Sequence, residues 1–483
     1  MALTQGKLLD AVPPLIVDLD GTLLRSDLLL ETFLAYVRKK PTGVVSVLGW
    51  LRQGKAELKE GLALAAELDV AVLPYDPEVL GLIRQARREG REVVLATASH
   101  RTLAERIAAH VGEFDDVFAS EQGLNLSAER KRALLVARYG EGGFDYLGNS
   151  RDDLAVWPSA REAIVVNPDA GVERKARRLA QVSQVIDSNP PSLRLWFKAL
   201  RLHQWMKNLL IFVPLLAAHL LGQPQQLLNG VLAFFCFGLC ASSVYVLNDL
   251  LDLNDDRHHR TKRNRPFASG RLRLGHGLLA VPLLLTAAFG AAAMLLPWQF
   301  SAVLGAYYLL TLAYSLYLKR QMTVDVIVLA MLYTARIIAG VAAFSVPLTF
   351  WILAFSMFIF LSLALVKRYA ELREARSRDM HAMTRGRGYY PGDLDMIASL
   401  GAASGYLSVM VLALYIHDGA TASLYAFPHV IWLACPLLLF WITRVWMLTH
   451  RGEMNDDPVV FAIRDRISQV IGLLFGVVFW VAT

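Results

Sequence analysis

The second half of the chain consists of long apolar runs that hold few charged residues. Nine such runs follow one another, at about 209–222, 228–247, 276–296, 299–317, 324–343, 347–366, 396–416, 425–447 and 467–482. Most of them approach the roughly 20 residues that a helix needs to cross a bilayer. A helix pairs its backbone polar groups internally, which the interior of a bilayer requires. We therefore expect residues 209–483 to form an all-α membrane bundle of nine transmembrane helices.

Lys and Arg occur on one set of connections between these runs. The connections after runs two, four, six and eight carry them, whereas those after runs one, three, five and seven carry none. Basic loops remain on the cytoplasmic side of a membrane. The pattern predicts a multi-pass protein of the cytoplasmic (inner) membrane, with a cytoplasmic N-terminal domain and the C-terminus on the outer side. The same topology explains the formal net charge of +7, so binding of nucleic acid is not expected.

Residues 1–188 mix charged and apolar side chains as a soluble globular domain does. The apolar segments LIVDL, EVVLAT, DDVFAS, FDYLGN and EAIVVN alternate with helical stretches, which is typical of a doubly wound α/β sheet. Residues 26–90 look helical and are expected to form a small cap. The stretch QVIDSNPPSLRL looks like a short linker, and residues 189–208 would combine the linker with an amphipathic interfacial helix.

The connection after the second apolar run carries clustered carboxylates followed by basic residues. Asn248, Asp249, Asp252 and Asp256 have the spacing NDxxDxxxD, which would place the three carboxylates on one face of a continuing helix. Clustered carboxylates repel one another unless a cation lies between them, and such hard oxygen ligands suit Mg²⁺. The basic residues that follow are Arg257, Arg260, Lys262, Arg263 and Arg265. Because guanidinium and ammonium groups bind phosphate oxygens, the segment predicts a site for Mg²⁺ and a diphosphate.

This motif, the nine runs and the basic connections resemble the UbiA prenyltransferase superfamily across residues 195–483. The resemblance implies that Asp249, Asp252 and Asp256 hold Mg²⁺ on a diphosphate, whose carbon–oxygen bond then ionises so that an acceptor captures the cation.

The chain departs from the ordinary prenyltransferases of this group in one connection. Those enzymes carry a second aspartate-rich motif after their sixth span, whereas this chain has Lys367, Arg368 and Tyr369 there. Lys and Arg suit direct binding of phosphate without a metal ion.

Three stretches, HQWMKN, TKRNRPFASG and KRYAEL, are similar to a branch of the superfamily, the decaprenyl-phosphate phosphoribosyltransferases. This similarity implies transfer of 5-phosphoribose from phosphoribosyl pyrophosphate to a polyprenyl phosphate. The residues expected to bind these substrates are Lys207, Asn208, Asn248, Lys262, Arg263, Arg265, Lys319, Asp325, Arg336, Lys367, Arg368 and Tyr369.

Arg336 lies well inside an apolar run. An unpaired charge there is costly, so its side chain should face the interior of the bundle. Asp325 lies about three helical turns earlier on the same face and is expected to join the same polar site.

Four polar motifs mark the N-terminal domain. Asp18 and Asp20 follow the first strand, Thr97 ends the strand EVVLAT, Lys131 opens a helix, and GNSRDD (148–153) follows FDYL. Active residues of a doubly wound sheet are expected at the carboxyl ends of its strands. These four pieces, in this order, resemble the four motifs of the haloacid dehalogenase superfamily.

The resemblance implies a role for each of these residues. Asp18 would be the nucleophile that forms an aspartyl phosphate, Asp20 the general acid and base, and Thr97 and Lys131 the pair that holds the phosphate. The residues expected to bind Mg²⁺ in this domain are Asp18, Asp20, Asn149 and Asp153. The fourth motif usually opens with Gly-Asp, so Asn149 replaces a charged ligand by a neutral one and would weaken catalysis.

The leading hypothesis is an enzyme with two activities. The membrane half would make a lipid-linked 5-phosphoribose, and the N-terminal half would remove its 5-phosphate. The partners would be a polyprenyl phosphate, phosphoribosyl pyrophosphate and the membrane, with a homo-oligomer left open. One alternative is an aromatic prenyltransferase with a regulatory or degenerate N-terminal domain, and another is a transporter or lipid-binding scaffold without catalysis.

Overall fold

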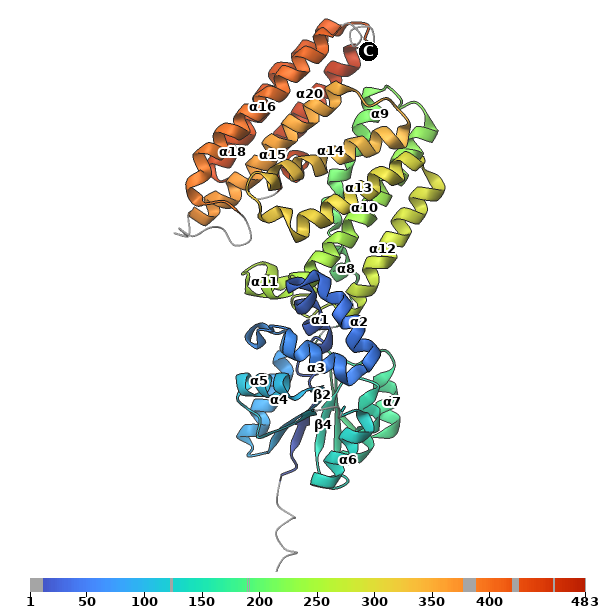
Figure 1. Cartoon of the computed structure of the whole chain (residues 1–483), viewed down its shortest axis with the longest axis vertical. Helices are drawn as coiled ribbons and strands as arrows, with labels where there is room; N and C mark the ends of the chain where they lie inside the picture. The colour runs from blue at the N-terminus through green and yellow to red at the C-terminus, as the bar shows by residue number, and fades with distance from the viewer. Residues whose placement is uncertain are drawn as a thin grey trace, which may run out of the picture. The chain divides into compact units, whose positions relative to one another are not determined.

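The structure is a computed structural model that describes residues 12–121, 125–188, 190, 192–376, 388–418, 425–454 and 457–482 (Figure 1). The chain divides into two compact units. The first comprises the chain up to Leu200 together with Tyr245–Val281, and the second comprises Arg201–Val244 and the chain from Pro282 onward. The aspartate-rich segment therefore belongs to the same compact unit as the N-terminal residues.

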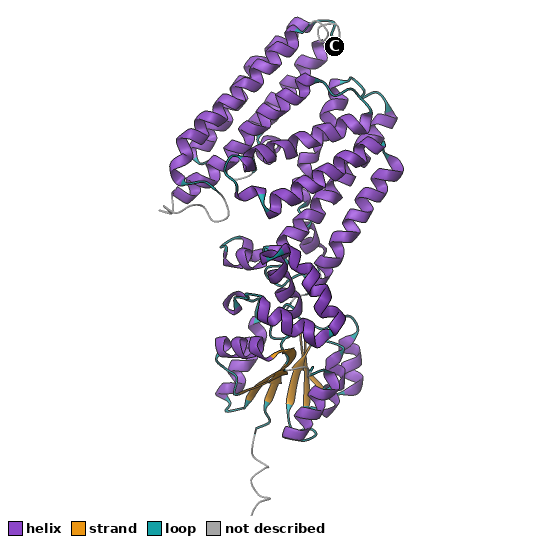
Figure 2. Cartoon of the chain, viewed as in Figure 1, coloured by secondary structure: helices purple, strands orange, loops and turns teal. Residues whose placement is uncertain are grey.

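A six-stranded parallel sheet forms the centre of the first unit (Figure 2). Its strands are β1 (Leu15–Val17), β2 (Val93–His100), β3 (Asp116–Ser120), β4 (Asp145–Gly148), β5 (Glu162–Val166) and β6 (Val182–Ile186). The strand order is β3-β2-β1-β4-β5-β6, with every neighbouring pair parallel. The chain leaves β1 toward β2 and later returns to its other side as β4, so a crevice opens at the carboxyl ends of β1 and β4. The predicted doubly wound α/β fold is confirmed.

Helices cover both faces of this sheet. They are α4 (Pro77–Arg88) and α5 (Arg101–Val111) on one face, and α6 (Ala128–Tyr139) and α7 (Val172–Leu179) on the other. Leu15 and Val17 pack with the first pair of helices, whereas Ile16 packs with the second pair. This alternation follows from the two-residue period of a strand that is buried on both faces.

Between β1 and β2 the chain forms helices, as the sequence predicts for residues 26–90. These are α1 (Leu28–Lys39), η1 (Pro41–Gly43), α2 (Val44–Gln53), α3 (Lys55–Ala65), η2 (Val70–Val72) and α4. Asp27 caps the first of them, since its Oδ1 accepts a hydrogen bond of 3.0 Å from the backbone N–H of Leu30.

Two boundaries in the first unit differ from the sequence-based prediction. The expected linker from Gln184 onward begins inside a strand, because β6 pairs with β5 as far as Ile186. This edge strand carries exposed polar residues, which hide the alternation of a buried strand. The strand predicted to end at Thr97 continues to His100 as part of β2.

The remaining elements are helical. They are α8 (Leu193–Ala199), η5 (Leu202–Phe212), α9 (Val213–Ala217), α10 (Pro224–Leu251), α11 (Leu253–His258), η6 (Lys262–Asn264), α12 (Leu274–Leu295), α13 (Trp298–Leu316), η7 (Leu318–Arg320), α14 (Val324–Phe344), α15 (Phe350–Arg376), η8 (Pro391–Asp393), α16 (Leu394–His417), η9 (Pro428–Leu433), α18 (Ala434–Arg451), α19 (Pro458–Arg464) and α20 (Arg466–Ala482).

Six of the described helices are long and apolar enough to cross a membrane, namely α10, α12, α14, α15, α16 with η8, and α18 with η9. The count rises to seven if α19 and α20, which meet at a bend of 81°, form one broken span. The nine predicted spans are therefore not confirmed. The run 209–222 forms the end of η5 and the five-residue α9, and the tyrosine-containing α13 is not among the six.

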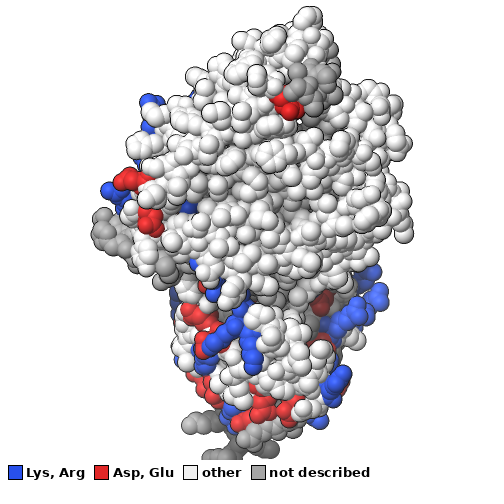
Figure 3. Space-filling model, turned by 45° about the horizontal axis from the view of Figure 1, so that its top comes forward, with Lys and Arg blue, Asp and Glu red and all other residues white. Residues whose placement is uncertain are grey.

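The surface of the second unit fits a membrane protein. Large apolar side chains are exposed on its helices, among them Trp298, Phe350 and Trp480. The face drawn in Figure 3 has a wide area that is almost free of charged side chains. Exposed apolar area of this kind is unfavourable in water and favourable in lipid, so the chain is a multi-pass membrane protein.

Candidate active sites

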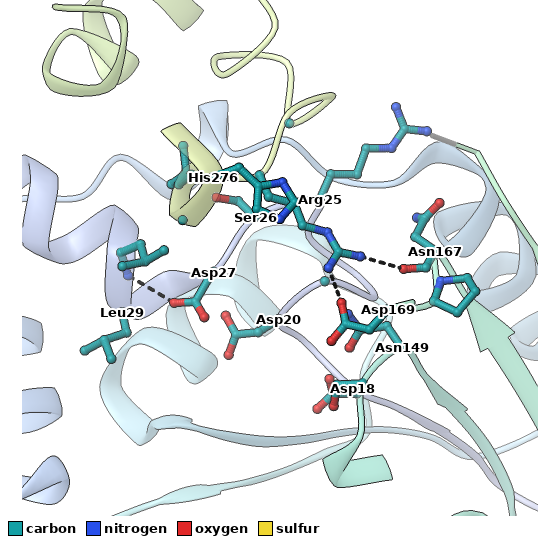
Figure 4. A pocket seen from close by; sticks show the side chains of 18 of the residues that line it. Asp18, Asp20, Arg25, Ser26, Asp27, Leu29, Asn149, Asn167, Asp169 and His276 are labelled. Atoms are coloured by element: carbon teal, nitrogen blue, oxygen red, sulfur yellow. Dashed lines mark hydrogen bonds and ion pairs between the residues drawn. The ribbon is translucent and has the colours of Figure 1, made fainter. Parts of the chain in front are cut away.

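A cavity of about 980 Å³ opens at the carboxyl ends of β1 and β4. Asp18 directly follows β1, Asn149 directly follows β4, and Lys131 reaches the cavity from the first turn of α6. Figure 4 shows Asp18, Asp20 and Asn149 close to one another on one side of this cavity. The fold thus brings three of the four predicted motifs to the crevice where ligands of such sheets bind.

A chain of buried hydrogen bonds fixes Asp18. Lys131 Nζ lies 2.6 Å from Asp18 Oδ1 and donates to the Tyr146 hydroxyl at 2.9 Å. That hydroxyl donates to Asp153 Oδ1 at 2.7 Å, and Asp153 Oδ2 accepts from the backbone N–H of Asn149 at 3.0 Å. Burial acts to lower the pKa of Lys131, but Asp18 and Asp153 outweigh it and raise that pKa. The ammonium group therefore stays charged beside Asp18.

Asp20 is held by hydrogen bonds from β2 and from the start of α1. Its Oδ2 accepts from Ser99 Oγ at 2.6 Å and its Oδ1 accepts from the Leu28 backbone N–H at 2.7 Å. Thr97 is buried and accepts from the Ser99 N–H at 3.0 Å, so β2 supplies the link between the second motif and Asp20. Burial raises the pKa of Asp18 to about 7 and that of Asp20 to about 6. A carboxyl group with a pKa near the working pH can both give and take a proton.

The same site has a set of oxygen donors that fits Mg²⁺. Asn149 Oδ1 is buried and has no hydrogen-bond partner within the described part of the chain. Gly21 has φ +78°, and a Cβ at that position would lie 2.0 Å from Asn149 Nδ2, so the DxDGT glycine makes room for this side chain. No cluster of three His, Cys, Asp or Glu side chains suited to a metal occurs among the described residues. With Asp18 and Asp20, the carboxamide of Asn149 nevertheless completes a donor set of hard oxygens.

The aspartate-rich segment is not the continuous helix that the sequence predicts. The helix α10 ends at Leu251, and Asp252 precedes the separate helix α11. Arg265 Nη1 bridges Asp249 Oδ1 at 3.1 Å and Asp256 Oδ2 at 2.7 Å, whereas Asp252 Oδ1 pairs with Arg38 of α1 at 2.7 Å. Two of the three carboxylates therefore share one cation, and the third faces a different one.

Short α11 is anchored by a buried ion pair. Arg257 Nη2 lies 2.6 Å from Glu31 Oε1, Arg257 Nη1 lies 3.0 Å from Glu31 Oε2, and Arg257 Nε donates to the Ala268 carbonyl at 2.9 Å. Ser26 Oγ also donates to Glu31. The ion pair leaves 5% of the Arg257 side chain and 2% of the Glu31 side chain exposed. This pairing of both charges with further hydrogen bonds is the condition under which buried ions are tolerated.

In the second unit, three polar side chains converge on Asp457. Lys207 Nζ lies 2.7 Å and Lys367 Nζ lies 3.2 Å from Asp457 Oδ2, and the Tyr333 hydroxyl donates to Oδ1 at 2.9 Å. Two predicted phosphate-binding lysines, 160 positions apart, are thus brought together by a carboxylate that the sequence analysis did not single out.

Arg336 faces the interior of the second unit, as predicted. Its Nε donates to Asn208 Oδ1 at 3.1 Å and its Nη2 donates to the Tyr307 hydroxyl at 3.1 Å. The guanidinium carbon also lies 5.3 Å from the centre of the Phe237 ring. Aromatic faces and amide oxygens stabilise this buried cation.

Asp325 and Arg336, expected in one polar site, have different partners. Asp325 Oδ2 pairs with Arg368 Nη2 at 2.6 Å, and Asp325 Oδ1 accepts from the Tyr389 hydroxyl at 2.6 Å. Arg368 is 1% exposed and also pairs with Glu371. Its guanidinium is therefore engaged by two carboxylates of its own unit, and its contact with a substrate phosphate stays a prediction.

The other five predicted substrate-binding residues range from buried to exposed. Tyr369 is buried and its hydroxyl lies 2.9 Å from His450 Nδ1. The remaining four comprise exposed Lys262 and Arg263 in η6, half-buried Lys319 in η7 and half-buried Asn248 in the last turn of α10.

Each half of the chain matches the model of a known family. The UbiA prenyltransferase family model matches residues 210–469, more than half of the chain. The chain belongs to the UbiA prenyltransferase family. Residues 15–154 match the haloacid dehalogenase-like hydrolase model, so this UbiA family member carries a haloacid dehalogenase-like domain ahead of its membrane helices.

Some similar proteins match almost the whole chain, and others match a little over half of it. The uncharacterized protein y4nM of Sinorhizobium fredii is 38% identical over 97% of this chain and 91% of its own length. The nodulation protein NoeC of Azorhizobium caulinodans is 38% identical over 58% of this chain and 92% of its own length. The decaprenyl-phosphate phosphoribosyltransferase of Mycobacterium tuberculosis is 32% identical over 59% of this chain and 91% of its own length. The two families are in general Mg²⁺-dependent.

Several residues that organise this UbiA family protein escaped the sequence analysis. Tyr146 lies inside a strand, and Arg38 and Glu31 lie in a helix of ordinary amphipathic pattern. Asp457 carried a weak local signal, since an Asp before Pro often caps a helix, and it does accept from the Val459 N–H at 3.2 Å. Nothing in the local sequence pointed to its two lysine partners.

Proposed function

We propose that this UbiA family protein transfers 5-phosphoribose from phosphoribosyl pyrophosphate to a polyprenyl phosphate, and that its N-terminal domain removes the 5-phosphate of the product. The transfer is supported by the similarity to three decaprenyl-phosphate phosphoribosyltransferases, at 29–32% identity. The hydrolysis is supported by one observation above others, the placement of Asp18, Asp20 and Asn149 around one cavity with Lys131 on Asp18. Both reactions would occur at the cytoplasmic face of the inner membrane, as the distribution of basic residues predicts.

In the proposed transfer, the bond between ribose C1 and pyrophosphate breaks and a bond from C1 to a lipid phosphate oxygen forms. C1 gains positive charge and the leaving pyrophosphate gains negative charge. Asp249, Asp252 and Asp256 would hold Mg²⁺, which when bound neutralises charge on the pyrophosphate. Arg265 already lies between Asp249 and Asp256, so it is placed to turn from these carboxylates to phosphate oxygens. Lys207 and Lys367 would bind a second phosphate.

In the proposed hydrolysis, Asp18 attacks the phosphorus of the 5-phosphate and the bond to the ribose oxygen breaks. Asp20 gives its proton to that oxygen, then takes a proton from the water that cleaves the aspartyl phosphate. Lys131 orients Asp18 and balances the charge of the phosphoryl group. Asp18, Asp20 and Asn149 would hold Mg²⁺, which when bound screens the negative charge between nucleophile and phosphate.

One assay tests the two reactions together. Purified full-length protein in lipid nanodiscs receives Mg²⁺, polyprenyl phosphate and phosphoribosyl pyrophosphate labelled in the ribose. The expected product is labelled lipid that lacks the 5-phosphate, identified by its mass. Turnover of geranyl or farnesyl diphosphate with an aromatic acceptor, and none with phosphoribosyl pyrophosphate, would overturn the proposed transfer.

Two substitutions separate the reactions. Asp249→Asn should lower lipid labelling at least 100-fold, whereas Asp255→Asn, an exposed carboxylate of the same segment, should leave it within about twofold. Asp18→Asn should leave labelling intact and stop the lipid at its phosphorylated stage. If the unmodified protein and Asp18→Asn both accumulate only phosphorylated lipid, the proposed phosphatase is refuted and the transferase is not.

A further inference from the structure

The cavity beside Asp18 is only partly built from the haloacid dehalogenase-like domain. Residues 270–276, which follow the aspartate-rich segment and lead into α12, form a part of its lining. These residues lie inside the range 210–469 that the UbiA family model matches. The candidate phosphatase therefore has a wall supplied by the other half of the chain.

This wall is packed closely against the N-terminal residues. Leu272 and Leu274 are buried in one apolar cluster with Leu34 of α1 and with Phe267. Gly270 has φ +69°, and a Cβ there would lie 2.6 Å from the Cβ of Arg25 and 2.9 Å from its carbonyl oxygen. Residues larger than glycine do not fit at such a distance, so the position of the wall is fixed by contact.

The wall brings positive and donor groups to a cavity whose catalytic end is acidic. Arg271, Arg273 and His276 all line the cavity and are exposed. Arg273 pairs with Asp169 and donates to the Asn167 carbonyl at 3.3 Å. In Figure 4, His276 is drawn above Asp20 and Asp18 below it. A ligand with one phosphate at Asp18 and a second anionic group would thus meet donors for both.

The same cavity also has apolar lining. Leu29 and Leu30 come from α1, and Leu193 and Trp196 come from α8. Leu193 is 74% exposed, and Phe197 on the same short helix is 54% exposed. A soluble phosphorylated sugar covers little of this apolar surface, whereas a hydrocarbon chain can bury much more of it. The volume lies at the upper end of the roughly 300–1,000 Å³ common for small-molecule sites, so it exceeds the needs of a phosphorylated pentose alone.

From these contacts we propose that residues 270–276 select the substrate of the phosphatase. Arg271 and His276 bind a phosphodiester group of a lipid-linked phosphomonoester, and Leu193 and Trp196 contact the start of its hydrocarbon chain. The inference rests on the proposed phosphatase function and adds the residues that would distinguish its lipid-linked substrate from a free sugar phosphate. The hydrolytic step keeps the balance described above, since the wall only binds and orients.

A comparison of two esters tests this selection. Full-length protein in nanodiscs with Mg²⁺ is given either ribose 5-phosphate or a polyprenyl-phosphoryl 5-phosphoribose, and kcat/KM is measured for each. The double variant Arg271→Gln and His276→Gln should lower the ratio of lipid ester to soluble ester at least 10-fold, since each lost donor to a phosphate weakens binding about tenfold. Arg84→Gln, on the exposed surface of α4 outside the cavity, is the control and should keep the ratio.

A matched pair of glycines tests the position of the wall. Gly270→Ala should lower the same ratio, because the added methyl group displaces residues 270–276. Gly90→Ala is the control, since Gly90 has φ +76° but nothing lies within 4 Å of its Cβ position. Both changes carry the same backbone strain, so a difference between them reports the contact with Arg25.

The outcomes separate the inference from the function on which it rests. An unchanged ratio in the double variant, or an equal loss for both esters, overturns the selecting wall while the phosphatase stands. If the unmodified protein cleaves neither ester, the phosphatase function fails. In that case, binding of the lipid ester to Asp18→Asn protein tests whether residues 270–276 recognise the lipid. The same affinity with and without Arg271→Gln and His276→Gln would refute that recognition.

Discussion

The buried pair between Glu31 and Arg257 allows a quantitative test of how the aspartate-rich segment is held. Replacing one partner leaves the other charge buried without compensation, which costs about 3–5 kcal/mol. Glu31→Leu and Arg257→Met should each lower the local stability of α11 by this amount. A replacement of both by apolar side chains removes both desolvation penalties, so the double variant should be close to the unmodified protein.

Hydrogen exchange followed by mass spectrometry of the full-length protein measures this stability. Because 1.4 kcal/mol is a factor of ten, each single change should speed amide exchange in α11 at least about 100-fold. The backbone hydrogen bond from Leu272 N to the Pro266 carbonyl, 2.9 Å long, should open with it. Strands β4 and β5 serve as the internal control and should keep their protection. Single variants that exchange like the unmodified protein, or a double variant as unstable as the two single effects added, would refute the reasoning.

Three further outcomes are expected. Tyr146→Phe removes the hydroxyl between Lys131 and Asp153, and each buried group that loses its hydrogen-bond partner costs about 1–3 kcal/mol of stability. The kcat of the phosphatase should fall about tenfold or more while lipid labelling persists. An unchanged kcat would show that the hydroxyl does not orient these groups. Asp457→Asn removes the charge that Lys207 and Lys367 share, so transfer should fall at least tenfold in the labelling assay, and normal transfer would separate this cluster from the reaction. Chelation of Mg²⁺ should stop both reactions and its return should restore both; persistence of either in chelator would remove the metal from that site.

The sequence was sufficient to predict the parts of the candidate site that short local motifs define. Asp18 and Asn149 each directly follow a strand, Asp20 lies two residues after Asp18, and the parallel order of β1 and β4 brings those strand ends together. Lys131 could be placed because the first turn of a helix beside this edge points at it. Local spacing and the rules of α/β topology therefore predicted the geometry of one candidate site, including the neutral Asn149.

The sequence was insufficient where the partners are distant along the chain. Arg38 pairs with Asp252, and Lys207 pairs with Asp457, which is 250 positions away. Neither helix period nor composition carries information on such pairs. The break of the helix at Asp252 escaped prediction for the same reason, since a regular spacing of carboxylates says nothing of the two arginines that hold them in different directions.

The first compact unit is assembled from two stretches of chain, and this imposes an order on its synthesis. The ribosome releases the sheet and α1 well before it reaches Arg257 and residues 270–276, and at ~5–20 residues per second the delay is on the order of ten seconds. During that interval the Glu31 carboxylate has no Arg257 to pair with. A truncated chain that ends after Leu200 would therefore lack residues 270–276 of the cavity and the arginine that pairs with Glu31.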